Sequence, residues 1–428
     1  MLDAKWVREH ADEVRDAATR KRFDPTVVDA YLENDRNYRA LLQQVESLRA
    51  DLKHSSSSLG KMEPAERDVA LTKQRAKKAS LKDLERQEHE LRAVVHDFAM
   101  RLPMPPASDV PDGRDDTGNV EMFISGPIPK KDFEIQTHDD LGEKLGIIDI
   151  KRGVKIAGSR NYLLMGDAAR LERAVLNLAL DHMQQRGFEM VSVPTLVNRA
   201  CMEGTGYFPG GEEQAYLVER DDLALVGTSE VPLTSIHSDE TLDFDRLPLR
   251  RVALSPCYRR EAGTYGKDTK GLYRVHQFWK VEQVVLGPND KAWSLEEHKR
   301  MLAHATDLMD LLELPYRVVN VCTGDLGQGQ VQKFDIETWM PSRNSYGETH
   351  SASRFHDFQT RRLNIRYRPE GKGKPQFCHS LNNTVIASPR VLIAFMENHQ
   401  EADGSIRVPV ALQPYLGGET FLRGKQGD

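Results

Sequence analysis

The stretch from Cys257 to Glu282, CYRREAGTYGKDTKGLYRVHQFWKVE, gathers residues that could bind a polyphosphate. Its apolar flanks predict two β-strands joined by a long polar loop. Arg259 lies at the end of the first strand and Arg274 at the start of the second, so a hairpin brings the two guanidinium groups together. The planar, permanently charged guanidinium group matches phosphate oxygens. A solvated hairpin with ordinary surface charges fits the spacing equally well. The stretch also contains the glycines and carboxylates Gly263, Gly266, Gly271, Glu261, Asp268 and Glu282.

The composition is that of a globular protein with two or three domains: 428 residues, 39% apolar and 29% charged. The net charge of -6 means that any nucleic-acid surface must be local. The cysteines form no CxxC pair, which argues against a structural zinc site or a disulfide framework. No apolar run approaches the roughly 18 residues of a membrane span, and the N-terminus lacks a signal-peptide core. These features predict a cytoplasmic protein.

Residues 27–102 carry the heptad pattern of a coiled coil. The first helix has apolar residues at Tyr38, Leu41, Val45, Leu48, Leu52 and Leu59. The second has them at Leu81, Leu84, Leu91, Val95, Phe98 and Leu102, with Glu88 interrupting the line. The break between Gly60 and Pro64 predicts an antiparallel hairpin of two helices, each roughly 35 residues and about 50 Å long. We expect residues 1–102 to form a separate helical arm.

The second helix of this arm is strongly basic. Residues 72–82 contain no acid, so ion pairing within the stretch does not explain it. A basic arm on an acidic protein points to a phosphate backbone as its partner, and a solvated helix face is the alternative. The candidate nucleic-acid-binding residues are Lys73, Arg75, Lys77, Lys78 and Lys82.

Residues 103–130 contain six prolines and read as a linker to a second domain over 131–428. Strands there follow one another without βαβ alternation, which favours an α+β fold, a large antiparallel sheet with flanking helices. The expected strands are 223–226, 249–258, 275–286, 316–321, 332–339, 358–368 and 377–382, and the expected helices are 171–186, 295–312 and 391–401. With no Gly-rich nucleotide loop, phosphates must be held by side chains.

Further polar groups lie near the predicted strands. Thr228 and Glu230 follow one strand, the segment Glu348–Ser353 precedes another, and Asn382 and Thr384 lead to Arg390 at a helix start. Taken one by one, these are weak signals, because a helix cap, a loop charge or a surface arginine would look the same.

Together, the motifs YRREAG, RVHQFWKVE, KFDIETWMP, FQTRRLNIRY and SLNNTVIASPRVLIAFMENHQ, in this order, resemble the seryl-tRNA synthetases. The resemblance runs from the N-terminal arm to the C-terminus and includes KIAGSRNYLLMGDAARLERAVLNLALD. It implies a class II synthetase sheet with a coiled-coil arm that binds tRNA(Ser). It also implies activation of L-serine with ATP and Mg²⁺, a homodimer joined near Pro194, and serine charging of selenocysteine tRNA in some members.

The resemblance also implies roles for single residues. Arg259 would bind the α-phosphate of ATP and Arg274 would lie beside the phosphates. Phe278 would stack on the adenine, with Arg390 on the other face and Glu261 beside it. Glu348 and Ser351 would hold Mg²⁺ between phosphates. The serine pocket would consist of Thr228, Glu230, Glu282, Asn382 and Thr384.

One segment departs from the common family form. After Glu348, Thr349 and His350 replace Ile and Ser, and Ala352 and Arg354 replace Cys and Asn, while Ser351 and Ser353 remain. This departure leaves open a specialised second copy, resistant to an inhibitor or serving biosynthesis. A synthetase-like ligase that loads a carrier protein is a further alternative, but such homologues lack the long arm.

Overall fold

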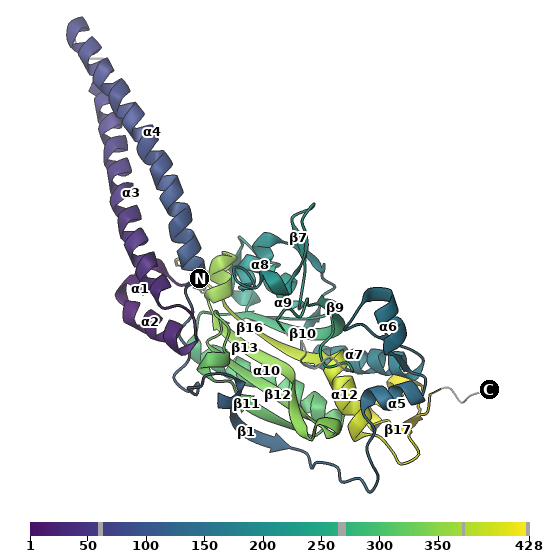
Figure 1. Cartoon of the computed structure of the whole chain (residues 1–428). Helices are drawn as coiled ribbons and strands as arrows, with labels where there is room; N and C mark the ends of the chain where they lie inside the picture. Colours follow the sequence, from purple (N-terminus) through teal and green to yellow (C-terminus); the bar gives the residue numbers. More distant parts are fainter. Residues whose placement is uncertain (59–62, 264–270, 370–372, 425–428) are drawn as a thin grey trace. The chain divides into compact units, whose positions relative to one another are not determined.

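The computed structural model describes residues 1–58, 63–263, 271–369 and 373–424 (Figure 1). The predicted loop residues Gly266 and Asp268 and the heptad residue Leu59 lie outside these ranges. The chain divides into two compact units, Met1–Pro105 and Pro106–Asp428, which are described in turn.

The N-terminal unit is a helical hairpin with a small base. Helices α3 (Thr26–Ser58) and α4 (Pro64–Arg101), of 33 and 38 residues, pack along each other as predicted. The short helices α1 (Ala4–Glu9) and α2 (Ala11–Arg20) complete the base, where Val7, Val14, Ala17 and Ala18 are buried. The name "arm" is used below for α3 and α4.

The apolar heptad positions form the contact between the two arm helices. Val45 and Leu52 are buried while the residues beside them are exposed, which is the expected coiled-coil seam. Glu88, which interrupts the heptad, is hydrogen-bonded to the phenol of Tyr38. A polar residue is therefore tolerated in the seam because it has a partner on the opposite helix.

The C-terminal unit is built on an eight-stranded sheet with the order β1-β11-β12-β13-β16-β10-β9-β4. Within the described ranges its neighbouring strands are antiparallel, except that β4 and β9 are parallel. This is the predicted α+β architecture. The strands are β1 (Val120–Ser125), β4 (Glu189–Met190), β9 (Leu249–Tyr258), β10 (Gln277–Gly287), β11 (Tyr316–Asn320), β12 (Gln332–Met340), β13 (Ser345–His356) and β16 (His379–Ala387).

The long helices α7 (Asp167–Gln185), α10 (Lys291–Leu311) and α12 (Ser388–Asn398) pack on this sheet. Their apolar faces join the strands in one core that includes Leu171, Met301 and Phe395. The strand β10 is buried along nearly its whole length. Its charged residues Lys280 and Glu282 are therefore buried too, which is costly unless they are paired or used.

A smaller sheet of β5 (Leu196–Asn198), β7 (Leu223–Leu225) and β6 (Tyr216–Val218) lies with α8 (Arg199–Thr205) and α9 (Glu230–Ser235). Thr205 at the end of α8 and Glu230 at the start of α9 line the cavity described below. Cys201, Cys257, Cys322 and Cys378 are free thiols. Among the described helices, none has the length and apolar character needed to cross a bilayer.

Two sequence-based assignments are wrong. The expected strand 358–368 begins instead as helix α11 (Phe358–Arg362), stabilised by an i,i+4 ion pair of 2.7 Å between Asp357 and Arg361. Only Arg366–Arg368 is a strand, β14. The polar run Glu348–Ser353 does not precede a strand, since it lies inside β13, in the middle of the large sheet.

Candidate active site

A cavity of about 300 Å³ brings together every residue predicted for the ATP and serine sites except Thr228. Two of its walls come from the central strands. Phe278, Lys280 and Glu282 alternate along β10 and so share one face, and Asn382 and Thr384 do the same on the paired strand β16. The other predicted residues in the lining are Glu230, Arg259, Glu261, Arg274, Glu348, Ser351 and Arg390.

Glu348 and Ser351 reach the same cavity because β13 is irregular there. In a regular strand, residues three apart point to opposite faces. The pairing of β12 with β13 shifts between Ile336 and Glu337, which leaves Thr349 as an extra residue on β13. This bulge puts the carboxylate and the hydroxyl on the cavity side.

One part of the cavity is rich in guanidinium groups. Arg259 lies 5.3 Å from the ring centroid of Phe278, and Arg390 lies 4.4 Å from that of Tyr273. Arg390 also donates from Nη1 to the backbone carbonyl of Glu348 at 2.7 Å and to its Oε2 at 3.3 Å. Such a set can neutralise phosphate charges while its aromatic rings offer faces for a base.

Arg259 and Arg274 lie at the two ends of the loop between β9 and β10, the predicted hairpin. Gln277 pairs with Tyr258, and the backbone N–H of Arg259 donates to the carbonyl of His276 at 2.9 Å. Arg274 lies 3.4 Å from Glu261, a residue with a positive φ of 53°. The entry and exit of the loop are thus fixed on one side of the sheet.

Another part of the cavity contains two buried carboxylates and one ammonium group. Lys280 Nζ lies 2.5 Å from Glu282 Oε2 and donates to Thr228 Oγ1 at 2.6 Å. Thr384 Oγ1 donates to Glu282 at 3.2 Å. Thr228, which is 1% exposed, does not line the cavity but contacts Lys280, which does.

Glu230 faces this pair of charges from α9. It accepts hydrogen bonds from the phenol of Tyr207 at 2.8 Å and the amide of Gln359 at 2.7 Å. Burial, followed by the charge of Glu282, raises the pKa of Glu230 to about 7. The site is therefore prepared for a cation, which would relieve the repulsion between the two carboxylates.

Asn382 also belongs to the lining of the cavity. Its side chain is 5% exposed, and Nδ2 has no hydrogen-bond partner among the described residues. A buried amide donor without a partner is costly, so a ligand oxygen is its natural acceptor.

The residues near the guanidinium groups fit Mg²⁺. Glu348 and Ser351 offer hard oxygen ligands, and the Glu348 side chain is 48% exposed. Partial loss of solvent around Glu348 opposes its ionisation, but the charges of Arg390 and Lys333 outweigh this effect and lower the pKa of Glu348. Within the described ranges, no three His, Cys, Asp or Glu side chains could hold a metal by themselves.

The comparisons with known proteins show which family the chain belongs to. Residues 1–106 match the seryl-tRNA synthetase N-terminal domain, and residues 216–399 match the class II tRNA synthetase core domain of the G, H, P, S and T enzymes. The serine–tRNA ligase of Deinococcus radiodurans is 45% identical over 99% of both chains. The chain belongs to the seryl-tRNA synthetases.

Solved structures of the same family share the whole fold. The seryl-tRNA synthetase of Pyrococcus horikoshii, complexed with ATP, has a TM-score of 0.93 and 37% identity over 100% of both chains. The serine–tRNA ligase of Naegleria fowleri, in complex with AMP, has a TM-score of 0.87 and 29% identity over 99% of this chain and 97% of that one. This seryl-tRNA synthetase is thus a serine–tRNA ligase with a class II fold and a helical arm.

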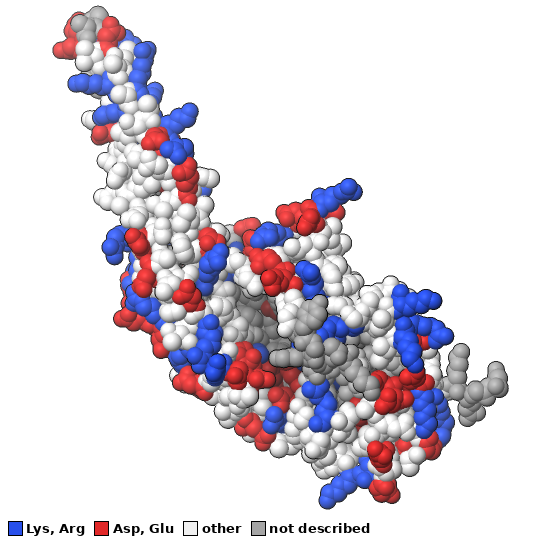
Figure 2. Space-filling view, viewed as in Figure 1, with Lys and Arg blue, Asp and Glu red and all other residues white. Residues whose placement is uncertain are grey.

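The predicted tRNA-binding residues lie on α4 of this synthetase, where Figure 2 shows basic side chains along the arm. Lys73, Arg75, Lys78 and Lys82 are exposed. Lys77 instead forms an ion pair of 3.1 Å with Asp51 of α3, which stabilises the hairpin.

Sequence reasoning did not assign Lys280, Tyr207 or Tyr273 to the site, although all three line the cavity. Lys280 carried a signal, since its spacing with Phe278 and Glu282 places all three on one strand face. Tyr207 and Tyr273 carried none, because they come from loops whose approach to the cavity depends on the folded chain.

Proposed function

We propose that this chain activates L-serine with ATP in the cavity and then transfers the seryl group to tRNA(Ser). A serine carboxylate oxygen attacks the α-phosphorus, the bond to the β-phosphate bridging oxygen breaks, and pyrophosphate leaves. The terminal ribose hydroxyl of tRNA next attacks the seryl carbonyl, and AMP leaves. The observation that supports this most is that guanidinium groups and buried carboxylates line one cavity.

Arg259 and Arg390 are the proposed catalytic residues. Attack on a phosphorus requires positioning and charge neutralisation more than proton transfer, so we assign no general base. Arg259 would contact the α-phosphate, with Arg274 beside the other phosphates. Phe278 would stack on the adenine, which Glu261 and Arg390 would flank.

Serine would bind at the carboxylates, with its ammonium group between Glu230 and Glu282. Asn382 and Thr384 would hydrogen-bond its hydroxyl group. Alanine would leave these buried groups unpaired, which is the strongest available basis for rejecting it. Thr228 would act indirectly, by holding Lys280 against Glu282.

Glu348 and Ser351 would hold Mg²⁺ in this proposal. When bound, the ion would neutralise phosphate charge and orient the leaving pyrophosphate. Arg390, which contacts Glu348, would keep that carboxylate facing the phosphates.

The arm would bind tRNA(Ser) through its phosphate backbone. Arg75, Lys78 and Lys82 are exposed on α4 and have i, i+3, i+7 spacing, which places them on one face of the helix. Backbone contacts position an RNA by shape without reading its bases. In this proposal residues 1–102 are the tRNA-binding domain and residues 131–428 the catalytic domain. The predicted linker 103–130 connects them and also contributes strand β1 to the catalytic sheet.

We also propose that the chain works as a homodimer in the cytoplasm. The match of residues 1–106 to the synthetase N-terminal domain speaks against a carrier-protein ligase, whose homologues lack the arm.

Serine-dependent ATP–pyrophosphate exchange tests the proposal. The purified chain should exchange pyrophosphate with serine alone among the twenty amino acids, and only with Mg²⁺. Exchange with another amino acid, or none at all, would refute the assignment of the pocket. Charging of a tRNA(Ser) transcript then tests the second step.

A further inference from the structure

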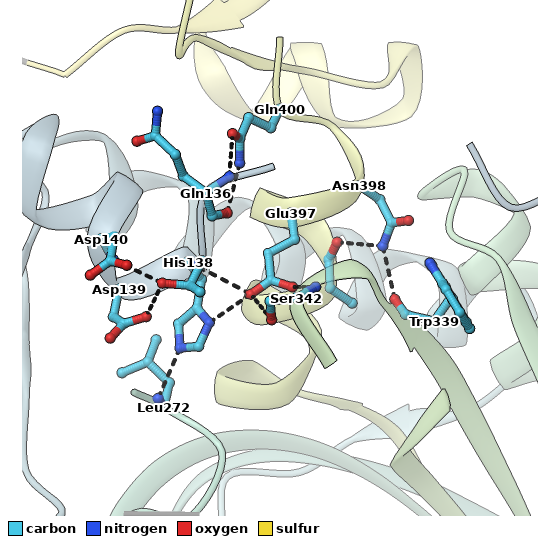
Figure 3. A network of polar contacts seen from close by, with 12 residues as sticks. Gln136, His138, Asp139, Asp140, Leu272, Trp339, Ser342, Glu397, Asn398 and Gln400 are labelled. Carbon is cyan, nitrogen blue, oxygen red and sulfur yellow. Dashed lines mark hydrogen bonds and ion pairs between the residues drawn. The ribbon is translucent and has the colours of Figure 1, made fainter. Parts of the chain in front are cut away.

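His138 links two segments beside the cavity, although it does not line the cavity itself (Figure 3). It is the first residue of α5 (His138–Lys144) and is 7% exposed. The backbone N–H of Leu272 lies 3.1 Å from His138 Nε2, and His138 Nδ1 lies 2.9 Å from Glu397 Oε1. Because Leu272 can only donate, Nε2 is the acceptor and Nδ1 carries the proton that is donated to Glu397.

Glu397 is the centre of this network. It lies in the last turn of α12, its side chain is fully buried, and the backbone N–H of His138 also donates to it, at 3.1 Å. Ser342 donates twice, from its hydroxyl at 2.8 Å and from its backbone N–H at 3.0 Å. Burial opposes ionisation, but the hydrogen bonds from His138 and Ser342 outweigh it and lower the pKa of Glu397. One carboxylate therefore fastens α5 and the Ser342 segment to α12.

The residues after Leu272 lead directly into the cavity. The carbonyl of Tyr273 accepts a hydrogen bond from Arg390 Nε at 3.3 Å. Its ring lies 4.2 Å from the guanidinium carbon of Arg343 and 4.4 Å from that of Arg390. The next residue is Arg274, another proposed ATP-binding residue.

The helix α12 connects the network to these groups. Arg390 and Glu397 are seven residues apart on it, about two turns, so their side chains leave the helix on the same side. Glu397 holds His138, His138 holds the backbone of Leu272, and Arg390 holds the carbonyl of Tyr273. The end of the loop between β9 and β10, called the loop exit below, is thus fixed to α12 at two points, Leu272 and Tyr273.

The fit between His138 and the loop exit is close. Gly271 has a positive φ of 72°, and a Cβ atom there would lie 2.3 Å from His138 Nε2. The imidazole therefore packs against the bare glycine backbone. Leu272 is itself completely buried, so losing the acceptor would leave its N–H without a partner and without water.

We infer that His138 is a positioning residue for ATP binding, because it holds Leu272 and so sets the placement of Tyr273, Arg274 and Arg390. This inference rests on the function proposed above. It assigns His138 no contact with the substrate.

Two substitutions separate the two hydrogen bonds of His138. In His138→Gln the side-chain oxygen can occupy the place of Nε2 and still accept from Leu272. In His138→Asn the amide nitrogen can occupy the place of Nδ1 and still donate to Glu397, but the side chain is too short for Leu272. Only the Gln variant keeps the bond that positions the loop exit.

The measurement is steady-state ATP–pyrophosphate exchange with serine, together with thermal unfolding of each variant. His138→Asn should raise the KM for ATP about tenfold, as expected for one lost buried hydrogen bond, with little change in the KM for serine. His138→Gln should restore most of the ATP affinity. The matched control is His399→Asn, which removes another buried histidine bond, the one from Nε2 to the Leu312 carbonyl at 2.9 Å, at the end of α12. It should lower the Tm and leave the KM for ATP unchanged.

Several outcomes would overturn the inference. These are an unchanged KM for ATP in His138→Asn, equal losses in the Asn and Gln variants, or an equal rise in His399→Asn. If His138→Asn does not fold, Ser342→Ala replaces it, since it removes one donor to Glu397 and should raise the KM for ATP by about threefold. An unchanged KM there would also refute the idea. A wild-type chain without serine-dependent exchange would instead refute the proposed function.

Discussion

Replacing Glu230 by Gln should stabilise the protein at pH 8 and abolish productive serine binding. The pKa of Glu230 is raised from 4.5 to about 7, by burial first and then by the charge of Glu282. Between pH 4.5 and pH 7 the Glu230 carboxyl holds a proton in the folded chain but has lost it in the unfolded chain. The free energy of unfolding therefore falls as the pH rises through this range to the folded pKa of about 7. At pH 8 the buried charge costs about 3 kcal/mol.

The neutral side-chain amide in Glu230→Gln removes the cost of the buried charge and can keep the hydrogen bonds to Gln359 and Tyr207. Gln359 can still donate to the amide oxygen of Gln at position 230, and Tyr207 can turn from donor to acceptor. We expect the free energy of unfolding in urea to rise by about 2–3 kcal/mol at pH 8 and to change little at pH 5. The matched control is Glu297→Gln, since Glu297 is 1% exposed and is held by Arg250 at 2.7 and 2.9 Å. It should lower stability by about 3 kcal/mol.

The same pKa predicts how the wild-type enzyme should respond to acid. Only the ionised form of Glu230 pairs with the serine ammonium group. The kcat/KM for serine in pyrophosphate exchange should therefore fall about tenfold for each pH unit below 7, while the KM for ATP changes little. A flat profile from pH 6 to pH 8, or a Glu230→Gln variant that is less stable at pH 8, would refute the reasoning.

Three further predictions concern the other proposed sites. The triple change of Arg75, Lys78 and Lys82 to Ala should raise the KM for tRNA(Ser) about tenfold or more in 150 mM salt, leaving pyrophosphate exchange unchanged; equal loss of both activities would contradict the arm's role. Glu348→Gln should raise the Mg²⁺ concentration needed for half-maximal exchange about tenfold, as read from a Mg²⁺ titration; an unchanged curve would remove Glu348 from the ion's ligands. Thr384→Val, which keeps the shape but not the hydroxyl, should lower kcat/KM for serine about 10- to 100-fold and leave that for alanine nearly unchanged, and parallel losses would argue against a role in reading the serine hydroxyl.

Elements of the fold were predictable from the sequence where a local pattern of residues determines the structure. The heptads predicted both arm helices because the apolar contact positions of a coiled coil repeat every seven residues, independently of contacts with the rest of the chain. The two strands around Arg259 and Arg274 were predictable because apolar segments flank a polar loop. Both patterns are local, and neither needs knowledge of distant contacts.

The wrong assignment of Glu348–Ser353 arose where distant contacts determine the structure. The run Glu348–Ser353 is polar and lacks the alternation of a strand, yet it forms part of β13 because distant side chains satisfy it. Thr349 shares a hydrogen bond of 2.7 Å with Thr338, and His350 Nε2 lies 3.1 Å from the carbonyl of Val385. Burial lowers the pKa of His350 to about 4, so the ring stays neutral in the sheet. No window of sequence around residue 350 contains these partners.

The proposed serine pocket illustrates how a buried charge cluster can serve binding. Glu230 and Glu282 face one ammonium group, that of Lys280, which is already 2.5 Å from Glu282. One carboxylate is therefore left to repel the other or to take up a proton, as the raised pKa of Glu230 indicates. An incoming ammonium group supplies the missing charge, so the free energy stored as repulsion in the empty pocket is released when the amino group binds. A pocket neutral without its ligand would lack this source of affinity, which is why we expect the more stable Glu230→Gln protein to be the weaker enzyme.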